Sequence, residues 1–344
     1  IAIRIAIPRA ESLPAVYFCV AVISVLPRSI YSSAMATNDA FLEASVATAI
    51  VGYLIIARGT EHTPLGIILI SIGTVASCWI KQSGLVLLVP LVGMSFATLL
   101  GLWTPPRGLT KNTILLVTIA TFLISGLDEF WRFNKSGMFL VSNQQYYSYA
   151  VGQLPGSIAS VSFFDFRFHE IYESVFMTPA SLDSFWTEVF SRFWFDYERR
   201  FFPINEHSVW TGRIAYIFGA VMTPYILYFM LVGLVRRPHD LTRLILVCFV
   251  SAFVTVPILQ TIRYPYFSSM KSVFILPGIS AILCLTAIGL AGGMTVRLSR
   301  TVVWSGTILL LIFGVFHTSS LALLSSEAWN HGVSGPLWPL PKLR

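Results

Sequence analysis

The chain has 344 residues, of which 55% are apolar and only 11% are Asp, Glu, Lys or Arg, and its mean hydropathy is +0.74. These values exclude an ordinary soluble domain and indicate a membrane protein with several spanning segments. The formal net charge of +7 does not indicate a nucleic-acid partner, because the basic residues are scattered through short loops between apolar segments. We therefore expect an all-α fold, a polytopic bundle of transmembrane helices.

Nine apolar segments are each about long enough to cross the hydrocarbon core of a bilayer. They cover residues 13–30, 40–57, 65–80, 84–103, 112–127, 214–235, 242–260, 272–294 and 301–324. This pattern predicts N-terminal membrane helices in residues 1–127, a loop subdomain in residues 128–212, and C-terminal membrane helices with a short tail in residues 213–344. The residues before the first segment begin without Met and do not fit a signal peptide, so we expect an N-terminal part to be missing.

The distribution of Lys and Arg between alternate loops indicates how the helices are oriented. One set of loops holds ten basic residues: Arg4, Arg9, Arg58, Arg107, Lys111, Arg236, Arg237, Arg243, Arg297 and Arg300. The other set holds six: Arg28, Lys81, Arg263, Lys271, Lys342 and Arg344. Because cytoplasmic loops are enriched in Lys and Arg, we expect the first set inside and the long loop and the C-terminus outside.

Small and sulfur-containing residues fall inside the apolar segments, where they suit helix packing. The four cysteines are Cys19, Cys78, Cys248 and Cys284, and we predict that they are packing residues without disulfides. The sequence GLAGGM at residues 289–294 suits close helix contact, either within the chain or against a partner subunit.

The long loop contains one aromatic amphipathic segment, SLDSFWTEVFSRFWFDYERRFFP at residues 181–203. Its large apolar residues recur at helical spacing behind Ser181 or Asp183 as a helix cap. The stripe consists of Phe185, Trp186, Val189, Phe190, Phe193 and Trp194. It fits a helix in the interfacial plane with its aromatic face toward lipid or toward the membrane helices, and it fits equally well a helix packed on the rest of the loop.

Three polar residues stand at the beginning of the second predicted helix. Asn38 or Thr37 is suited to cap the helix, Asp39 follows in the first turn, where the helix dipole favours a carboxylate, and Glu43 lies four residues later on the same face. Two interpretations stay open for both acids: capping and anchoring of the helix, or carboxylates that face an outer cavity. Asp39 is the candidate catalytic acid of such a pocket.

Cations stand at two other outer turns of the predicted bundle. Lys81 and Gln82 form a turn between the third and fourth helices, and Arg263 and Lys271 border a later outer loop. A lysine at such a turn is suited either to reach lipid headgroups or to bind a phosphate at the rim of a cavity. These charges fit a ligand with an anionic lipid-phosphate linkage and a hydroxyl-bearing head. The candidate substrate-binding residues are Asn38, Glu43, Lys81, Arg263 and Lys271.

Residues with metal-binding side chains do not form a recognisable ligand set. Asp128 and Glu129 directly follow the fifth predicted helix, and His169 and Glu173 share a helical face in HEIYE. No further His or Cys stands at zinc-ligand spacing, so no metal site is predicted. The sequence also lacks a phosphate-binding glycine loop, a nucleophile elbow and a redox pair, which argues against soluble nucleotide chemistry.

Several short motifs, taken in order, resemble those of a known family. Pro27 is followed about ten residues later by Asn38-Asp39 and an apolar helix, and residues 81–85 form a K-x-(S/T)-G-L turn. A large outer loop comes next, and residues 271–277 fit K-x-x-(F/Y)-x-L-P. This order, spread over most of residues 10–290, resembles the polytopic GT-C glycosyltransferases. Within this family, the order of motifs most resembles that of the bacterial branch similar to dolichyl-phosphate-mannose protein mannosyltransferases and lipid A aminoarabinose transferases.

The resemblance implies inverting transfer of a sugar from a polyprenyl-phosphate lipid donor to an acceptor on the outer face of a bacterial cytoplasmic membrane. In that family the principal acid, which deprotonates the acceptor hydroxyl, lies in a first outer loop that precedes anything in this chain. Asp39 matches a later acidic position at a helix mouth. Lys81 and Lys271, and then Arg263, are the candidates that face the phosphate. Some members use a divalent cation and others do not, so a divalent cation stays open as the cofactor.

Two other functions stay open on the sequence alone. One is a non-catalytic GT-C-like membrane subunit of a larger complex. The other is a lipid or solute transporter, which requires polar residues at mid-depth in several spans and often shows repeat symmetry. The sixth to ninth predicted spans carry almost no ionisable residue there, so the transporter ranks third. Membrane lipids are expected partners in every case.

Overall fold

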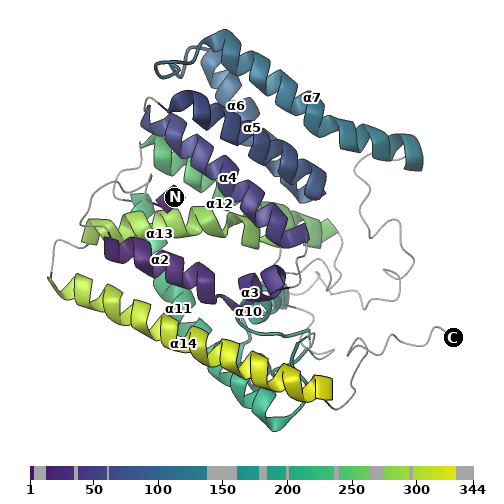
Figure 1. The fold of residues 1–344 in the computed structure, drawn as a ribbon, viewed down its shortest axis with the longest axis vertical. Coiled ribbons are helices and arrows are strands. Elements are labelled where there is room, and N and C mark those ends of the chain that lie inside the picture. Colours follow the sequence, from purple (N-terminus) through teal and green to yellow (C-terminus); the bar gives the residue numbers. More distant parts are fainter. Residues whose placement is uncertain are drawn as a thin grey trace.

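The computed structural model describes residues 1–3, 13–34, 38–59, 62–137, 161–177, 184–198, 201–235, 240–263, 274–293 and 297–330. These residues form helices joined by short turns, without a strand among them (Figure 1). The predicted all-α fold is therefore confirmed.

Seven segments of the described chain are long and apolar enough to cross a membrane. They are α4 (Asn38–Arg58), α5 (Thr63–Ile80), the 3₁₀ helix η2 (Gln82–Leu87) with α6 (Leu88–Leu99), α7 (Lys111–Ser136), α11 (Glu206–Val235), α12 (Leu241–Arg263) and α14 (Arg297–Asn330). A lipid bilayer admits a chain only where the backbone groups are satisfied internally, as they are in such helices. The protein is thus an integral membrane protein.

The first and eighth predicted spans differ from single straight helices. The first consists of α2 (Leu13–Val25) and α3 (Pro27–Ala34), which meet at an angle of 59°. Pro27 explains the break, because a proline disfavours helical backbone at the residue before it. The eighth consists of η8 (Leu276–Gly278) and α13 (Ile279–Gly293), whose apolar part is too short to count among the seven. The bent pair raises the number of spans in the described chain from seven to eight, one fewer than the nine predicted.

The fifth membrane helix is longer than predicted. It continues as α7 to Ser136 and ends at Gly137, which has a left-handed φ of 69° and whose N–H donates to the Phe133 carbonyl. The prediction that Asp128 directly follows this helix was therefore wrong. An ion pair of 2.7 Å joins Asp128 to Arg132 one turn later, and such pairs stabilise a helix that composition alone would end.

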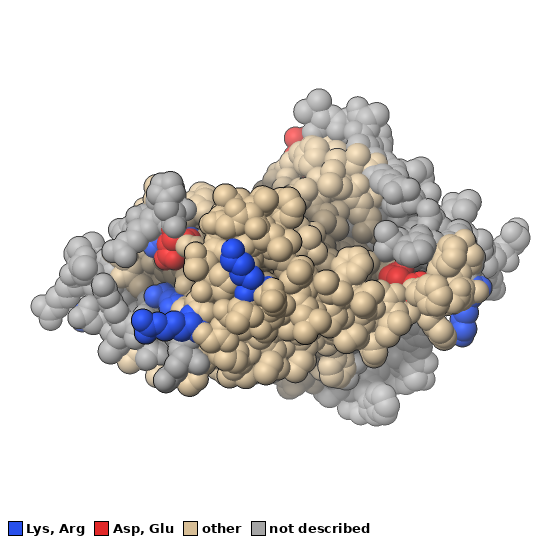
Figure 2. Space-filling model, turned by 90° about the horizontal axis from the view of Figure 1, so that it is seen from above, with Lys and Arg blue, Asp and Glu red and all other residues tan. Residues whose placement is uncertain are grey.

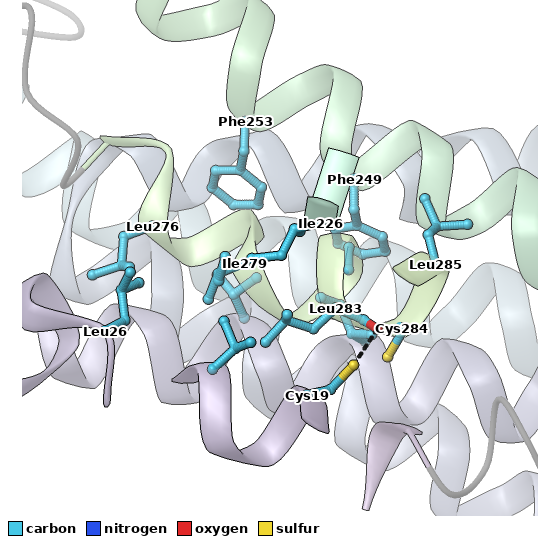
Figure 3. Close-up of a cluster of buried hydrophobic side chains, with 14 of the residues drawn as sticks. Cys19, Leu26, Ile226, Phe249, Phe253, Leu276, Ile279, Leu283, Cys284 and Leu285 are labelled. Carbon is cyan, nitrogen blue, oxygen red and sulfur yellow. Dashed lines mark hydrogen bonds between the residues drawn. The ribbon is translucent and has the colours of Figure 1, made fainter. Parts of the chain in front are cut away.

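The helices pack as neighbouring pairs, and α13 contacts α2, α4, α11 and α12. The most extensive contacts join α4 to α5, α11 to α13 and α14 to α2. Figure 3 shows how residues of α2, α11 and α12 meet α13 in one apolar core, where the Cys19 thiol donates to the Leu283 carbonyl at 3.4 Å. All four cysteines are free, as predicted, and three of them are buried.

One glycine of the GLAGGM sequence is required by close helix contact inside the chain. A Cβ atom on Gly289 of α13 would overlap the carbonyl oxygen of Phe229 in α11. The backbones of the two helices therefore approach without an intervening side chain, a packing that small residues permit in membranes. For Gly289, the within-chain alternative is the one that the structure supports.

The helix ends predicted to lie outside are found together at one end of the bundle. In Figure 1 the first residues of α4 and the last residues of α7, α12 and α14 lie on the right of the view. Figure 2 shows that charged side chains are few on the face seen from above and that wide uncharged areas separate them. This distribution suits helices surrounded by lipid, with charge kept near their ends.

The loop subdomain places a short helix, α10 (Phe185–Trp194), at the same end of the bundle, in contact with α3 and α11. Two small elements accompany it, η4 (Val161–Phe164) and α9 (Phe168–Glu173). The side chain of Ser184 caps α10 by accepting from the Thr187 N–H, so the predicted cap at Ser181 or Asp183 was wrong. The sequence offered several cap-forming residues in a row, and spacing alone did not choose among them.

The aromatic face of α10 packs inward. Trp194 donates from Nε1 to the Thr223 hydroxyl of α11 at 2.9 Å, and its ring lies against Phe218 and Phe313. At the other end of the helix, Phe185 meets Phe163 of the loop. The stripe therefore contacts both the membrane helices and the rest of the loop, and its buried residues do not face lipid.

Candidate functional site

An ion pair joins the beginning of α4 to the end of α5. Asp39, in the first turn of α4, accepts from the Lys81 ammonium at 2.6 Å. The two side chains are 16% and 25% exposed, so the pair lies at the surface of the bundle without being free in solvent. Capping is therefore not the only role of Asp39, which binds a cation that lies 42 residues away in sequence.

Phe274 completes the corner formed by this ion pair. The Lys81 ammonium lies 4.7 Å from the centre of the Phe274 ring, a cation–π distance. Phe274 belongs to the third sequence motif, and Asp39 and Lys81 belong to the first and second. The fold thus brings residues of all three motifs together, and we refer to Asp39, Lys81 and Phe274 as the ion-pair corner.

Gly84 fixes the turn that presents Lys81. A Cβ atom on Gly84 would overlap the backbone of Ser77, so η2 lies directly on the last turns of α5. Two backbone hydrogen bonds hold the same turn: the Lys81 N–H donates to the Ser77 carbonyl at 3.1 Å, and the Gly84 N–H donates to the Lys81 carbonyl at 2.8 Å. The position of Lys81 is therefore set by backbone packing as well as by its charge.

A small hollow adjoins the ion-pair corner. It is lined by Ser83, Val86, Phe253, Val256, Pro257, Gln260 and Phe274. Its volume of about 10 Å³ has room for one water molecule, and a sugar does not fit without movement of its walls. Among the described residues, Gln82 Nε2 and Ser83 Oγ are buried polar atoms without a hydrogen-bond partner, which suits water or a polar ligand at this place.

The other predicted binding residues have different environments. Asn38 is exposed and is the first residue of α4, and Thr37, the other predicted cap, lies outside the described residues. Glu43 is half-buried and lies within reach of the Ser29 hydroxyl on α3. Arg263 ends α12, but its side chain, like all of Lys271, lies outside the described residues.

A second charged cluster lies on α10 and was not predicted. Arg192 binds Glu188 one turn earlier through Nη1, and it donates from Nε to Glu198 at 2.9 Å. The Tyr197 hydroxyl donates to Glu188 at 3.1 Å. Arg192 and Glu188 are almost wholly buried, at 2% and 0% exposure. We refer to Glu188, Arg192, Tyr197 and Glu198 as the α10 cluster.

The electrostatics of the α10 cluster follow from burial and from mutual attraction. Burial raises the pKa of Glu188, and the charge of Arg192 works against that rise. For Arg192, burial lowers the pKa, but the two neighbouring acids outweigh it and raise the pKa above its ordinary value. Each charge is therefore tolerated in the interior because the other is present.

A hollow next to the α10 cluster is lined by Arg28, Tyr31, Arg192, Phe195, Asp196, Tyr197 and Glu198, and its volume is about 10 Å³. Tyr31 and His317 share a hydrogen bond of 2.7 Å that ties α3 to α14. Asp196 accepts from the backbone N–H groups of Phe201 and Phe202 at 2.5 and 2.9 Å. The Tyr31 ring also stacks on Phe201 with a centroid distance of 4.7 Å, and this aromatic contact fastens the loop to α3.

The HEIYE segment places His169 and Glu173 together on one exposed face of α9. His169 and Glu173 lie 3.8 Å apart on α9, and both side chains are more than two-thirds exposed. Within the described ranges, no group of three or more His, Cys, Asp and Glu residues is placed to hold a metal ion. The two residues share a helical face, as predicted.

No protein-family model, curated protein or solved structure matches this chain.

Sequence reasoning missed the α10 cluster although a signal for it was present. Glu188 and Arg192 stand four residues apart on one face of an aromatic helix, the spacing of an intrahelical ion pair. The contact between Lys81 and Phe274 has no comparable signal, because the two residues are distant in sequence and only the packing of α4, α5 and η8 brings their segments together.

Proposed function

We propose that the protein is a membrane glycosyltransferase of the GT-C type, which transfers a sugar from a polyprenyl-phosphate donor to an acceptor on the extracytoplasmic face of a bacterial cytoplasmic membrane. One observation carries the proposal: residues of three separate motifs meet in the ion-pair corner. Asp39 and Lys81 lie 2.6 Å apart, and Phe274 covers Lys81. Structural packing alone gives no reason for a partly exposed Lys–Asp pair to coincide with these three motifs.

In the proposed reaction, an acceptor hydroxyl attacks the anomeric carbon of the donor, the bond from that carbon to the phosphate oxygen breaks, and the configuration inverts. Lys81 stabilises the negative charge of the departing lipid phosphate. Asp39 holds Lys81 in place before the donor binds, and afterwards it binds hydroxyl groups of the sugar or the acceptor. The hydroxyl proton passes to a carboxylate that acts as the general base.

Charge and position support this division of roles. An ammonium group is a compact charge suited to phosphate, and at 25% exposure Lys81 remains accessible from outside. Glu43 lies one helical turn beyond Asp39 on α4 and extends the acidic side of the corner. Lys271 and Arg263 are proposed as further contacts of the phosphate, and a divalent cation as an optional one.

One observation favours a second candidate, a non-catalytic GT-C-like subunit. Asp39 already neutralises Lys81, and the adjoining hollow of about 10 Å³ does not accept a sugar as it stands. A protein that kept the fold and lost the chemistry would have such a closed corner. The transferase instead requires the corner to open when the donor binds.

A transfer assay separates the two candidates. The protein, expressed from its full reading frame in membranes, is supplied with a panel of radiolabelled polyprenyl-phosphate sugars, and release of the sugar is measured. We expect turnover by wild type, a loss of at least tenfold in Asp39→Asn and Lys81→Met, and little change in the control Asp128→Asn, because the Asp128–Arg132 ion pair lies elsewhere on the bundle. No turnover of any donor by wild type would favour the non-catalytic subunit.

A further inference from the structure

The inward face of α7 is polar along several turns. Thr118, Thr121, Ser125 and Glu129 recur at steps of three or four residues, and all four are at least nine-tenths buried. The opposite face carries exposed apolar residues such as Leu123, Leu127 and Phe130. A helix with lipid on one side and a buried polar row on the other presents that row to its neighbours, here α5 and α6.

Glu129 ends this row with a buried carboxylate that has no partner in the described part of the chain. The residue is 6% exposed, and neither Oε1 nor Oε2 accepts a hydrogen bond there. It lies inside the membrane span Lys111–Lys135, about 9 Å from its end at 1.5 Å per residue. A carboxylate in such a place is very unfavourable unless a positive charge neutralises it.

The neighbouring acid shows how different the surroundings of Glu129 are. Asp128 is adjacent in sequence, but it points to a side of α7 where Arg132 binds it at 2.7 Å, and its side chain is 23% exposed. One acid therefore has its counter-charge and access to solvent, whereas the other has neither within the described residues.

The cations nearest to Glu129 along α7 and α5 already have acidic partners: Arg132 binds Asp128, and Lys81, directly after α5, binds Asp39. Ser125, one turn earlier on the same face, is 1% exposed, and its hydroxyl lies beside the Cys78 thiol of α5. The carboxylates of Asp128 and Glu129 are close enough to interact electrostatically with the Cys78 thiol. Cys78 is the only titratable residue of α5, and α6 has none. Residues 138–160, which follow α7, contain no Lys, Arg or His.

We propose that Glu129 and Ser125 form a binding site for one small monovalent cation, a sodium ion or a proton, held between α5 and α7. The shared chemistry is a single positive charge delivered to a buried carboxylate, with the Ser125 hydroxyl as a further oxygen ligand. The described residues contain no group of three or more His, Cys, Asp and Glu residues placed for a metal ion, which argues against a divalent transition metal. The site is independent of the ion-pair corner and of the proposed transferase.

Thermal unfolding in lipid nanodiscs tests the site. The apparent Tm of the full chain is measured at a fixed scan rate in sodium chloride and in N-methyl-D-glucamine chloride of equal ionic strength, between pH 5 and pH 9. A ligand that binds only the folded protein raises its Tm. We expect the Tm of wild type to rise by several degrees with sodium if the cation is sodium. If the cation is a proton, we expect the Tm to fall as the pH rises, with or without sodium.

Two variants make the result specific. Glu129→Gln keeps the shape and removes the charge, so its Tm should lose the sodium or pH dependence seen in wild type. The matched control Asp128→Asn should keep it. Equal sodium and pH dependence in wild type and Glu129→Gln would overturn the proposal.

A chemical measurement on wild type covers the case in which Glu129→Gln does not fold. A hydrophobic carbodiimide adds to a protonated carboxylic acid in a membrane, and the adduct rearranges to a stable N-acylurea without a leaving group. Mass spectrometry should find the adduct on Glu129 and not on Asp128, with a yield that falls at high pH and, for a sodium site, in the presence of sodium. Labelling of Glu129 that depends on neither condition, or the absence of labelling, would overturn the proposal.

Discussion

The ion-pair corner and the α10 cluster lie at the same end of the bundle, and both join acids to a cation. In the α10 cluster, Arg192 is 2% exposed and binds two acids from one short stretch of sequence. In the corner, Lys81 binds a single acid, is 25% exposed and comes from a different helix than its partner. The residues of the α10 cluster are close in sequence and almost wholly buried. Those of the ion-pair corner are distant in sequence and partly exposed.

This difference indicates which charges hold the fold and which remain available to a ligand. A buried charge that already has two partners cannot leave them without a large penalty, so the α10 cluster holds residues 188–198 of the loop subdomain together. A partly exposed pair contributes less to stability, and a phosphate can replace one partner at smaller cost. The predictions below test this contrast, from the largest expected effect to the smallest.

Arg192→Met should have the largest effect on stability. Removal of the guanidinium leaves Glu188 buried without its counter-charge, and breaking one side of such a pair lowers the free energy of unfolding by about 3–5 kcal/mol. The measurement is unfolding of the purified protein in mixed micelles by increasing fractions of SDS. Arg132→Met, which breaks the more exposed ion pair to Asp128, is the control and should change the free energy far less.

The same variant should have an altered pH dependence. Without Arg192, nothing in the α10 cluster opposes the effect of burial, and the pKa of Glu188 rises further. A carboxyl group whose pKa is higher in the folded state than in the unfolded state adds stability at low pH and loses it as the pH rises. Arg192→Met should therefore recover stability relative to wild type on acidification. A constant difference between the two proteins from pH 5 to pH 8 would contradict this account of Glu188.

Gly84→Ala should have the second-largest effect on stability, because it disturbs the backbone contact that positions the ion-pair corner. The new methyl group would overlap the Ser77 backbone, and overpacking of this kind lowers the free energy of unfolding by about 1–3 kcal/mol. Gly93→Ala in α6 is the matched control, since nothing lies within 4 Å of a Cβ atom there. The control should leave stability unchanged or raise it, and equal losses in both variants would show that Gly84 does not hold the turn.

Trp194→Phe, which weakens the contact between α10 and α11, should lower the free energy of unfolding less than Gly84→Ala does. The variant keeps an aromatic ring against Phe218 and removes the hydrogen bond from Nε1 to Thr223, worth about 0.5–1.5 kcal/mol. Thr223→Val and the double variant complete a thermodynamic cycle. A coupling free energy near zero between the two positions would mean that this bond does not help to attach α10 to α11.

Asp39→Asn should have the smallest effect on stability. The ion pair to Lys81 is partly exposed, so its loss should lower the free energy of unfolding by about 1 kcal/mol or less. SDS-induced unfolding of wild type and variant provides the measurement. A loss of unfolding free energy as large as that of Arg192→Met would mean that the ion-pair corner stabilises the fold and is not free to bind a ligand.

The sequence predicted the membrane helices well where apolar length decides the outcome. It placed the boundaries of α7 and of the first span less well. The charges of Asp128 and Glu129 suggested a loop, but α7 continues past them and Asp128 pairs with Arg132 within the helix. Pro27 divides an apolar run that the sequence analysis took as one helix. Mean hydropathy predicts which segments lie in lipid. The ends and bends of helices depend on a few local contacts, which mean hydropathy does not predict.

For the candidate site, the sequence placed Asp39 and Lys81 at the same end of the predicted bundle, but it did not predict that they pair. Asp39 and Lys81 were each singled out, whereas their mutual contact depends on the close packing of α4 against α5. The separation of Asp128 from Glu129 could not be seen either. The two acids are adjacent in sequence, and only the orientation of α7 leaves one paired and the other buried.

The measurement that tests the central claim most directly compares Lys81→Met with Arg192→Met for stability and for binding of a polyprenyl phosphate in the same nanodiscs. The account predicts that the lipid phosphate raises the Tm of wild type, that Lys81→Met has nearly the Tm of wild type but loses this rise, and that Arg192→Met unfolds at a much lower temperature. A Lys81→Met protein that is stabilised by the lipid phosphate as strongly as wild type would contradict the assignment of the ion-pair corner to ligand binding.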